Sequence, residues 1–275
     1  MDGEGYVRPG SLERAIREDT AIVSVMLANN EIGTVQPIRQ LADIAHAHGA
    51  LMHTDAVQAV GAVPVDVKEL GVDLLSLSAH KFHGPKGVGA LYIRKGVFID
   101  SLIHGGAQER GKRAGTDNTP GIVGLGEAIA IATAELERNA AHEAALRDRL
   151  MNGILARIPG ARINGGMTHR LPGNLNVSFS GVEGEALLLR LDLAGVCASS
   201  GSACTSGSLD PSHVLMAIGL TPEQAAGSLR FSVGTENTEA EIDRTLELLP
   251  GIVENLRELT RGVFTEPVCP IEKRG

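Results

Sequence analysis

The sequence predicts an α/β protein, because short apolar runs alternate with helical spacing along its first half. The segment IRQLADIAHAHG (38–49) has the spacing of an amphipathic helix. Four runs have the length and composition of strands: AIVSVMLA (21–28), ALMHTDA (50–56), VDLLSLSA (72–79) and GVGALYIRK (87–95). Continuous apolar runs separated by helices are typical of a largely parallel sheet covered on both faces. We therefore expect a mostly parallel sheet in the first half.

The second half predicts a smaller α+β domain. Apolar residues at helical spacing from Ile122 to Leu136, and then at Leu146, Leu150 and Ile154, predict a long helix that bridges two domains. Beyond it we expect a half-buried strand at 174–180, a helix at 183–195 that ends on Gly195, a strand at 228–234, and a C-terminal helix after a capping box of Thr238 and Glu241, kinked or split at Pro250. The predicted domains are residues 1–137 and 138–275.

Composition excludes several classes of protein. The 25 basic and 33 acidic residues give a net charge of −8 without runs of one sign, which argues against a nucleic-acid or membrane surface. No apolar stretch approaches the length of roughly 18 residues that a membrane span needs, and the N-terminus lacks the apolar core of a signal peptide, so we expect a cytoplasmic protein.

The three cysteines predict neither a disulfide framework nor a metal site, because their spacing fits no zinc motif. We expect Cys197 to be buried as a packing residue, and Cys204 to be an exposed thiol because it lies in the polar, small-residue segment ASSGSACTSGS (198–208). Cys269, in the tail, has no neighbours that suggest a role.

Lys81, in SLSAHKFHGPKG (76–87), is the first candidate for chemistry. It follows a predicted buried strand, and open α/β sheets bind their ligands at the carboxyl ends of strands. A lysine near another cation can present a neutral amine for Schiff-base formation, while Ser78, His80 and the following glycines offer donors for a phosphate. This combination suggests pyridoxal 5'-phosphate (PLP). The alternative is a solvated lysine with a chance histidine neighbour.

Asp55, in HTDAVQAVG (53–61), strengthens the PLP interpretation. It ends another predicted parallel strand, so it would open onto the same edge of the sheet as Lys81. A carboxylate there can keep a pyridine nitrogen protonated, and Gln58 could donate to the ring oxygen. Alone, an aspartate at a strand end is more often a cap or a turn residue.

At this point the sequence resembles the class I cysteine desulfurases, PLP enzymes of aminotransferase class V with the aspartate-aminotransferase fold, which supply sulfur for iron–sulfur clusters. The resemblance extends from about Ala21 to Leu248 and rests on six blocks in order: ANNEIGTVQPI, HTDAVQAVG, SLSAHKFHGPKGVGALY, HGGAQERGKRAGTDN, SSGSACTS and SLRFSVG.

The resemblance implies a cofactor site. In it Lys81 would be the Schiff-base lysine, Asp55 the partner of the pyridinium and Gln58 the partner of the ring oxygen. Ser78 and His80 would bind the phosphate. Thr116 would reach the phosphate of a neighbouring subunit, which implies a homodimer.

The resemblance also implies a substrate site and a reaction. Asn30 and Arg230 would bind the carboxylate of L-cysteine, and Cys204 would accept its sulfur as a persulfide, leaving L-alanine. A sulfur acceptor or scaffold protein would be the partner. The chain lacks the N-terminal segment of the family, so it resembles a truncated or split member.

Two other interpretations of the function remain open. One is a selenocysteine lyase or another PLP enzyme of β-elimination, which would not need Cys204. The other is a catalytically silent fragment that binds a partner or a complementing N-terminal chain.

Overall fold

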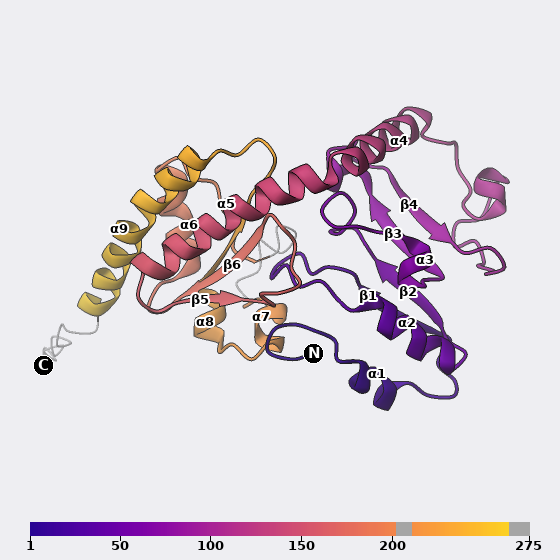
Figure 1. Cartoon of the computed structure of the whole chain (residues 1–275), viewed down its shortest axis with the longest axis horizontal. Helices are drawn as coiled ribbons and strands as arrows, with labels where there is room; N and C mark the ends of the chain where they lie inside the picture. Colours follow the sequence, from indigo (N-terminus) through magenta and orange to yellow (C-terminus); the bar gives the residue numbers. More distant parts are fainter. Residues whose placement is uncertain (202–210, 264–275) are drawn as a thin grey trace, which may run out of the picture. The chain divides into compact units, whose positions relative to one another are not determined.

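The computed structural model describes residues 1–201 and 211–263 (Figure 1). The described chain divides by packing into two compact units. The first comprises Met1–Ala144 with Gly165–Gly173, and the second comprises Ala145–Asn164 with the described residues from Asn174 on. The domain limits expected from the sequence remain a prediction. Among the described helices, none is both long and apolar enough to cross a membrane.

The first unit contains a four-stranded sheet in the order β1-β2-β3-β4. Its strands are β1 (Ile22–Met26), β2 (Leu51–Asp55), β3 (Leu74–Ser78) and β4 (Gly89–Ile93). The first three run parallel and β4 is antiparallel to β3. This confirms the predicted α/β class and the largely parallel sheet.

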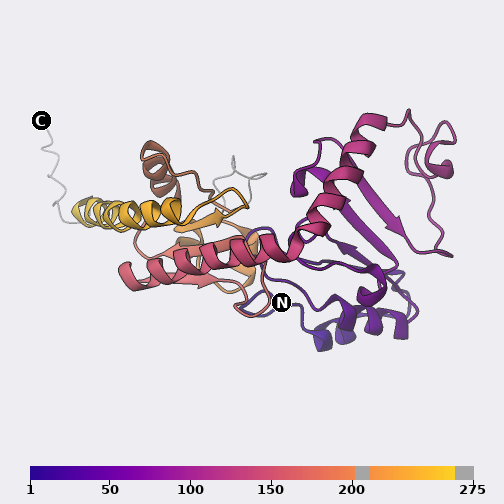
Figure 2. The same cartoon turned by 45° about the horizontal axis from the view of Figure 1, so that its top comes forward.

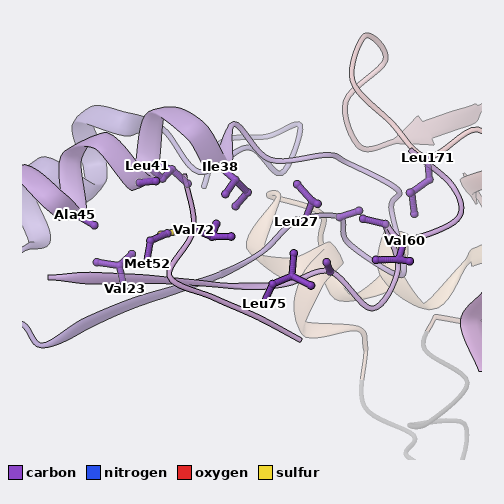
Figure 3. Packing of buried hydrophobic residues seen from close by; sticks show 14 of the residues in the cluster. Val23, Leu27, Ile38, Leu41, Ala45, Met52, Val60, Val72, Leu75 and Leu171 are labelled. Atoms are coloured by element: carbon purple, nitrogen blue, oxygen red, sulfur yellow. The ribbon is translucent and has the colours of Figure 1, made fainter. Parts of the chain in front are cut away.

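The helices of the first unit pack around one hydrophobic core on one face of this sheet. They are α1 (Pro9–Ala15), α2 (Ile38–Ala47), α3 (Val67–Leu70), the 3-10 turn η1 (Ala79–Phe82) and α4 (Thr119–Ala134). A second 3-10 turn, η2 (Gln108–Gly111), has no buried residue. Figure 3 shows Ile38, Leu41 and Ala45 of α2 facing Met52 and Val23 of the strands. Leu125, Ala128, Ile129 and Ala132 of α4 pack against the same core.

The opposite face of the sheet differs from the sequence prediction, which expected cover on both faces. In the described residues Ile22 and Leu91, which share this face, are each 47% exposed, and Ser24 is exposed as well. The physical reason lies in the strand sequences, since each parallel strand places polar side chains on this face: Ser24 on β1, His53 and Asp55 on β2, and Ser76 and Ser78 on β3. The runs are therefore not buried uniformly on both faces, because the second face mixes apolar and polar side chains.

The second unit is an α+β arrangement, as predicted. Its antiparallel sheet has the order β5-β6-β7, with β5 (Ala161–Asn164), β6 (Asn174–Phe179) and β7 (Ser228–Ser232). The helices are α6 (Gly184–Leu193), α7 (His213–Ala217), α8 (Pro222–Ala226) and α9 (Glu239–Val263). The helix α5 (Leu136–Arg157) begins in the first unit and continues in the second.

The central strand β6 corrects one prediction, because all six of its residues are buried, whereas the sequence predicted a half-buried strand. Its polar residues are accommodated by hydrogen bonds. The side-chain amide of Asn164 donates to Asn176 Oδ1 (2.7 Å) and to Ser178 Oγ (2.8 Å). Buried polar groups of this kind are stable only when paired, and the paired positions fix the register of β5 against β6.

The C-terminal helix α9 begins at the predicted capping box. Thr238 N donates to Glu241 Oε2 (2.8 Å), and Glu241 N donates to Thr238 Oγ1 (3.3 Å). The helix is not split at Pro250, since it extends from Glu239 to Val263.

A buried carboxylate joins three elements at the amino end of the sheet. Asp73 is fully buried, accepts a hydrogen bond from Met52 N (2.7 Å), and pairs with His46 Nε2 (2.8 Å) and Arg94 Nη2 (2.6 Å). Burial raises the pKa of Asp73, but the Met52 amide, His46 and Arg94 outweigh it, so the pKa lies below its ordinary value. The ionised carboxylate therefore stabilises the fold.

We expect Asp73→Asn to lower the free energy of unfolding by about 2 kcal/mol, because the buried group loses its charge-assisted partners. Because the folded-state pKa is lowered, this stabilisation is fully present above about pH 4 and is lost as pH falls through the lowered pKa. Denaturant unfolding from pH 7 to pH 3 measures both effects. The matched control is Asp43→Asn, which removes an exposed ion pair with Arg39 and should cost under about 0.5 kcal/mol. Equal losses in the two variants would contradict the prediction.

Candidate active site

The parallel pairing of β2 and β3 brings the predicted cofactor residues to one edge of the sheet (Figure 1). Asp55 is the last residue of β2 and pairs with Ser76, two residues before β3 ends at Ser78. Just beyond these ends, Ala56 N donates to Ser76 O (2.9 Å), so the register continues to the edge. Ligands of open α/β sheets bind at this carboxyl edge.

Lys81 is exposed because the turn around it is anchored on both sides. Its neighbours in η1, Ala79 and Phe82, are 0% and 3% exposed, which leaves Lys81 on the outer side of the turn. His83 ends the turn in the left-handed conformation (φ 65°), and its N–H donates to Ala79 O. Few non-glycine residues adopt this conformation, which ends the 3-10 turn just after Lys81 and Phe82.

Two glycines allow the chain to approach closely around this turn. A Cβ on Gly84 would lie 2.9 Å from Ala79 Cβ and 3.1 Å from Ala128 Cβ of α4. A Cβ on Gly89 would lie 2.6 Å from Leu77 O. The chain just after the lysine turn is therefore packed tightly against η1 and α4, and β4 approaches β3 closely at Gly89.

A polar pair lies beside Lys81 at the end of β3. Ser78 Oγ and His80 Nδ1 are 2.8 Å apart, with Ser78 half-buried and His80 exposed. A hydroxyl and an imidazole N–H are the donors that a phosphate requires. The predicted phosphate ligands are thus already oriented toward each other.

Asp55 and Gln58 supply the remaining groups on the β2 side. Both are half-buried, and Asp55 Oδ1 accepts a hydrogen bond from Val57 N (2.9 Å), which holds the carboxylate at the strand end. The edge therefore offers an amine, a carboxylate, a side-chain amide and hydroxyl and imidazole donors. This set of donors fits PLP, which has an aldehyde, a ring nitrogen, a ring oxygen and a phosphate.

Other predicted site residues lie elsewhere. Thr116 is exposed in the segment between η2 and α4, which extends away from the sheet in Figure 2. Asn30 is half-buried in the turn after β1, while Arg230 is half-buried on β7 in the second unit. Their predicted roles toward phosphate and substrate remain predictions.

The cysteines give one correction. Cys197 is exposed, not buried as expected, because its neighbours Val196 and Ala198 pack against the core of the second unit and leave Cys197 on the outer side of the segment. Cys204 and Cys269 lie outside the described residues.

Sequence reasoning missed a row of side chains that crosses the exposed face of the sheet. Ser24 Oγ lies 2.7 Å from His53 Nδ1, and His53 Nε2 lies 2.9 Å from Ser76 Oγ. Part of the signal was present in the sequence, since Ser24 and Ser76 alternate with apolar residues in their strands, but only the register shows that they align with His53.

The chain belongs to the aminotransferase class-V family, whose model matches residues 1–245. Members of this family depend on PLP, so the predicted cofactor is confirmed at the level of the family, and so is the predicted resemblance.

Similar proteins point to one activity within the family. The chain is 55% identical over 274 residues to cysteine desulfurase IscS of Methanosarcina thermophila, covering 100% of this chain and 66% of that relative. A solved NifS-like protein is 43% identical, with a TM-score of 0.85 and coverage of 93% of this chain and 67% of the other. SspA, solved in complex with cysteine, is 36% identical, with a TM-score of 0.71 and coverage of 86% and 65%. The chain therefore spans just under two thirds of the curated relative's length.

We expect Gly84→Ala to displace the lysine turn and to lower stability by about 1–3 kcal/mol, because the added methyl group overlaps Ala79 and Ala128. The matched control is Gly126→Ala in α4, where a Cβ meets nothing within 4 Å and the helix gains up to about 1 kcal/mol. Thermal unfolding measures stability, and equilibrium dialysis with PLP measures whether the displaced turn also binds less cofactor. A Gly84 variant as stable as the Gly126 variant would show that the turn is not tightly packed.

Proposed function

We propose that the chain acts as a PLP-dependent cysteine desulfurase, which converts L-cysteine to L-alanine and retains the sulfur as a persulfide on Cys204. One observation carries the proposal: Asp55, Ser78 and the Lys81 turn meet at one edge of a parallel sheet. The relatives named as cysteine desulfurases, and the relative solved with cysteine, support the substrate.

Five residues of the first unit would hold the cofactor. Lys81 Nζ would bond to its aldehyde carbon, and the carboxylate of Asp55 would hold a proton on the ring nitrogen. Gln58 would donate to the ring oxygen, while Ser78 and His80 would donate to the phosphate. When bound, PLP supplies an electron sink that stabilises negative charge at the substrate's Cα.

Lys81 would also move the proton. Displaced from the cofactor by the substrate's amine, its neutral Nζ can take the proton from the substrate's Cα, because general bases act when they lie within hydrogen-bond reach. Asn30 and Arg230 would hold the substrate carboxylate, since a guanidinium engages both oxygens at once.

Cys204 would accept the sulfur. Its thiolate attacks the substrate's Sγ, an S–S bond forms and the C–S bond breaks, with the electron pair remaining on the substrate carbon. Protonation of that carbon and return of a proton from Lys81 to Cα would give L-alanine, and the persulfide would remain on the enzyme. A thiol acceptor then removes the outer sulfur.

The assembly and location of the chain complete the proposal. We propose a cytoplasmic homodimer in which Thr116 reaches the phosphate bound by the partner subunit, and a sulfur-acceptor or scaffold protein that receives the persulfide sulfur. The exposed position of Thr116 supports such a reach.

Reduction with borohydride tests the lysine. After incubation with PLP and reduction, peptide mass spectrometry should find the phosphopyridoxyl group on Lys81, and Lys81→Ala should lose both this label and the visible absorbance band. Lys86→Ala, at another exposed lysine five residues further on, should keep both. A label on Lys86, or none on the folded wild-type chain, would overturn the assignment.

Substitution of cysteine tests the sulfur acceptor. In a dithiol-dependent assay of the PLP-loaded chain, Cys204→Ala should reduce sulfide release from L-cysteine by at least about 100-fold, because the nucleophile is lost. Cys197→Ala removes a different exposed thiol and should keep the parental rate. Sulfide release at the parental rate by Cys204→Ala would exclude the persulfide route and favour direct β-elimination.

A further inference from the structure

The row of Ser24, His53 and Ser76 lies on the same face of the sheet as Asp55. By the register of the strands, this face carries Ile22, Ser24 and Met26 of β1, Leu51, His53 and Asp55 of β2, Leu74, Ser76 and Ser78 of β3, and Gly89, Leu91 and Ile93 of β4. The opposite face carries the apolar core. His53 and Asp55 are consecutive residues of β2 on this face, so their Cα atoms are about 7 Å apart.

We propose that His53 is a positioning residue for Asp55, which sets how strongly that carboxylate holds the protonated ring of the cofactor. The inference rests on the proposed role of Asp55. It goes beyond that role by assigning a pH-dependent function to a residue that does not itself touch the cofactor.

The hydrogen bonds of His53 allow it to gain a proton without rearrangement. Neutral imidazole has one donor and one acceptor nitrogen, and a serine hydroxyl can serve as either. Imidazolium donates from both nitrogens, and Ser24 Oγ (2.7 Å) and Ser76 Oγ (2.9 Å) can both accept. Only the hydroxyl hydrogen of the serine that had donated to the ring needs to rotate. The row therefore keeps both bonds in either protonation state.

The proton on His53 would act mainly on Asp55, because the other charged side chains near the sheet lie beyond the two ends of its strands. On this face of the four strands, His53 and Asp55 are the titratable side chains. His80 and Lys81 follow β3 beyond the carboxyl edge, whereas Asp73 lies at the amino end, where His46 and Arg94 already pair with it.

The sign of the effect follows from charge. A positive imidazolium attracts the Asp55 carboxylate and repels the positive ring nitrogen that the same carboxylate would hold. Protonation of His53 should therefore weaken PLP binding, and loss of that proton should strengthen it. The test therefore compares pH values on either side of the range in which histidine side chains ordinarily change charge.

A double-mutant cycle on the chain without cofactor tests the coupling by itself. Asp55→Asn and His53→Gln keep hydrogen-bonding groups but cannot ionise. In the presence of His53, Asp55→Asn should raise the unfolding equilibrium constant about threefold to sevenfold more at pH 5.5 than at pH 8, the size expected for two charges about 7 Å apart that are largely screened by water. In the His53→Gln background this extra effect should vanish.

Two controls separate coupling from structural damage. His48→Gln, at the exposed end of α2, should leave the extra effect of Asp55→Asn unchanged. A purely structural role of His53 would lower stability equally at both pH values, and that result would overturn the proposal.

Binding of PLP tests the connection to the cofactor. By equilibrium dialysis, the dissociation constant of the wild-type chain should rise between pH 8 and pH 5.5 by about threefold more than that of His53→Gln. If the cycle shows coupling but both proteins bind PLP with the same pH dependence, the link to the cofactor is wrong. If neither binds PLP, the proposed function fails and the role toward the cofactor fails with it, whereas the cycle still decides whether His53 and Asp55 are coupled.

Discussion

The parallel pairing of β1, β2 and β3 is the constraint on which the site depends. Parallel strands end at the same edge, so the register that pairs Asp55 with Ser76 also places the Lys81 turn beside the end of β2. A slip of one residue would move Asp55 to the core face, where α2 packs, and would bury a carboxylate without a partner. The apolar side chains of the core face, such as Met52 and Leu75, prevent such a slip.

The two faces of this sheet have different roles. One face buries Val23, Met52 and Leu75 under the helices and supplies the stability of the first unit. The other carries hydroxyls, an imidazole and a carboxylate, and it leaves Ile22 and Leu91 each 47% exposed in the described part of the chain. Burial of the first face stabilises the sheet. The second face can therefore carry polar and titratable side chains, because side chains that stay in contact with water do not need other interactions to offset a loss of hydration.

The anchoring of the lysine turn shows how stability and chemistry are connected. Ala79 and Phe82 are fixed in the core, and Gly84 and Gly89 let neighbouring backbone approach within distances that a side chain would prevent. Lys81 is thereby exposed at a fixed position while the residues around it remain packed. Catalytic groups are most effective when a rigid scaffold holds them in this way.

The sequence by itself determined the class of the fold, most strands and helices, the capping box at Thr238, and the candidate residues at the ends of β2 and β3. These depend on local patterns, which short segments carry independently of their neighbours. The sequence did not determine the full burial of β6, the exposure of Cys197 or the exposed face of the first sheet. The burial of a residue depends on what packs against it, and the sequence pattern of one strand does not show which other elements lie against that strand. Only the tertiary structure decided that Ser24, His53 and Ser76, which lie 52 positions apart from first to last, align into one hydrogen-bonded row. That alignment is a property of strand register, which arises from the packing of the whole sheet.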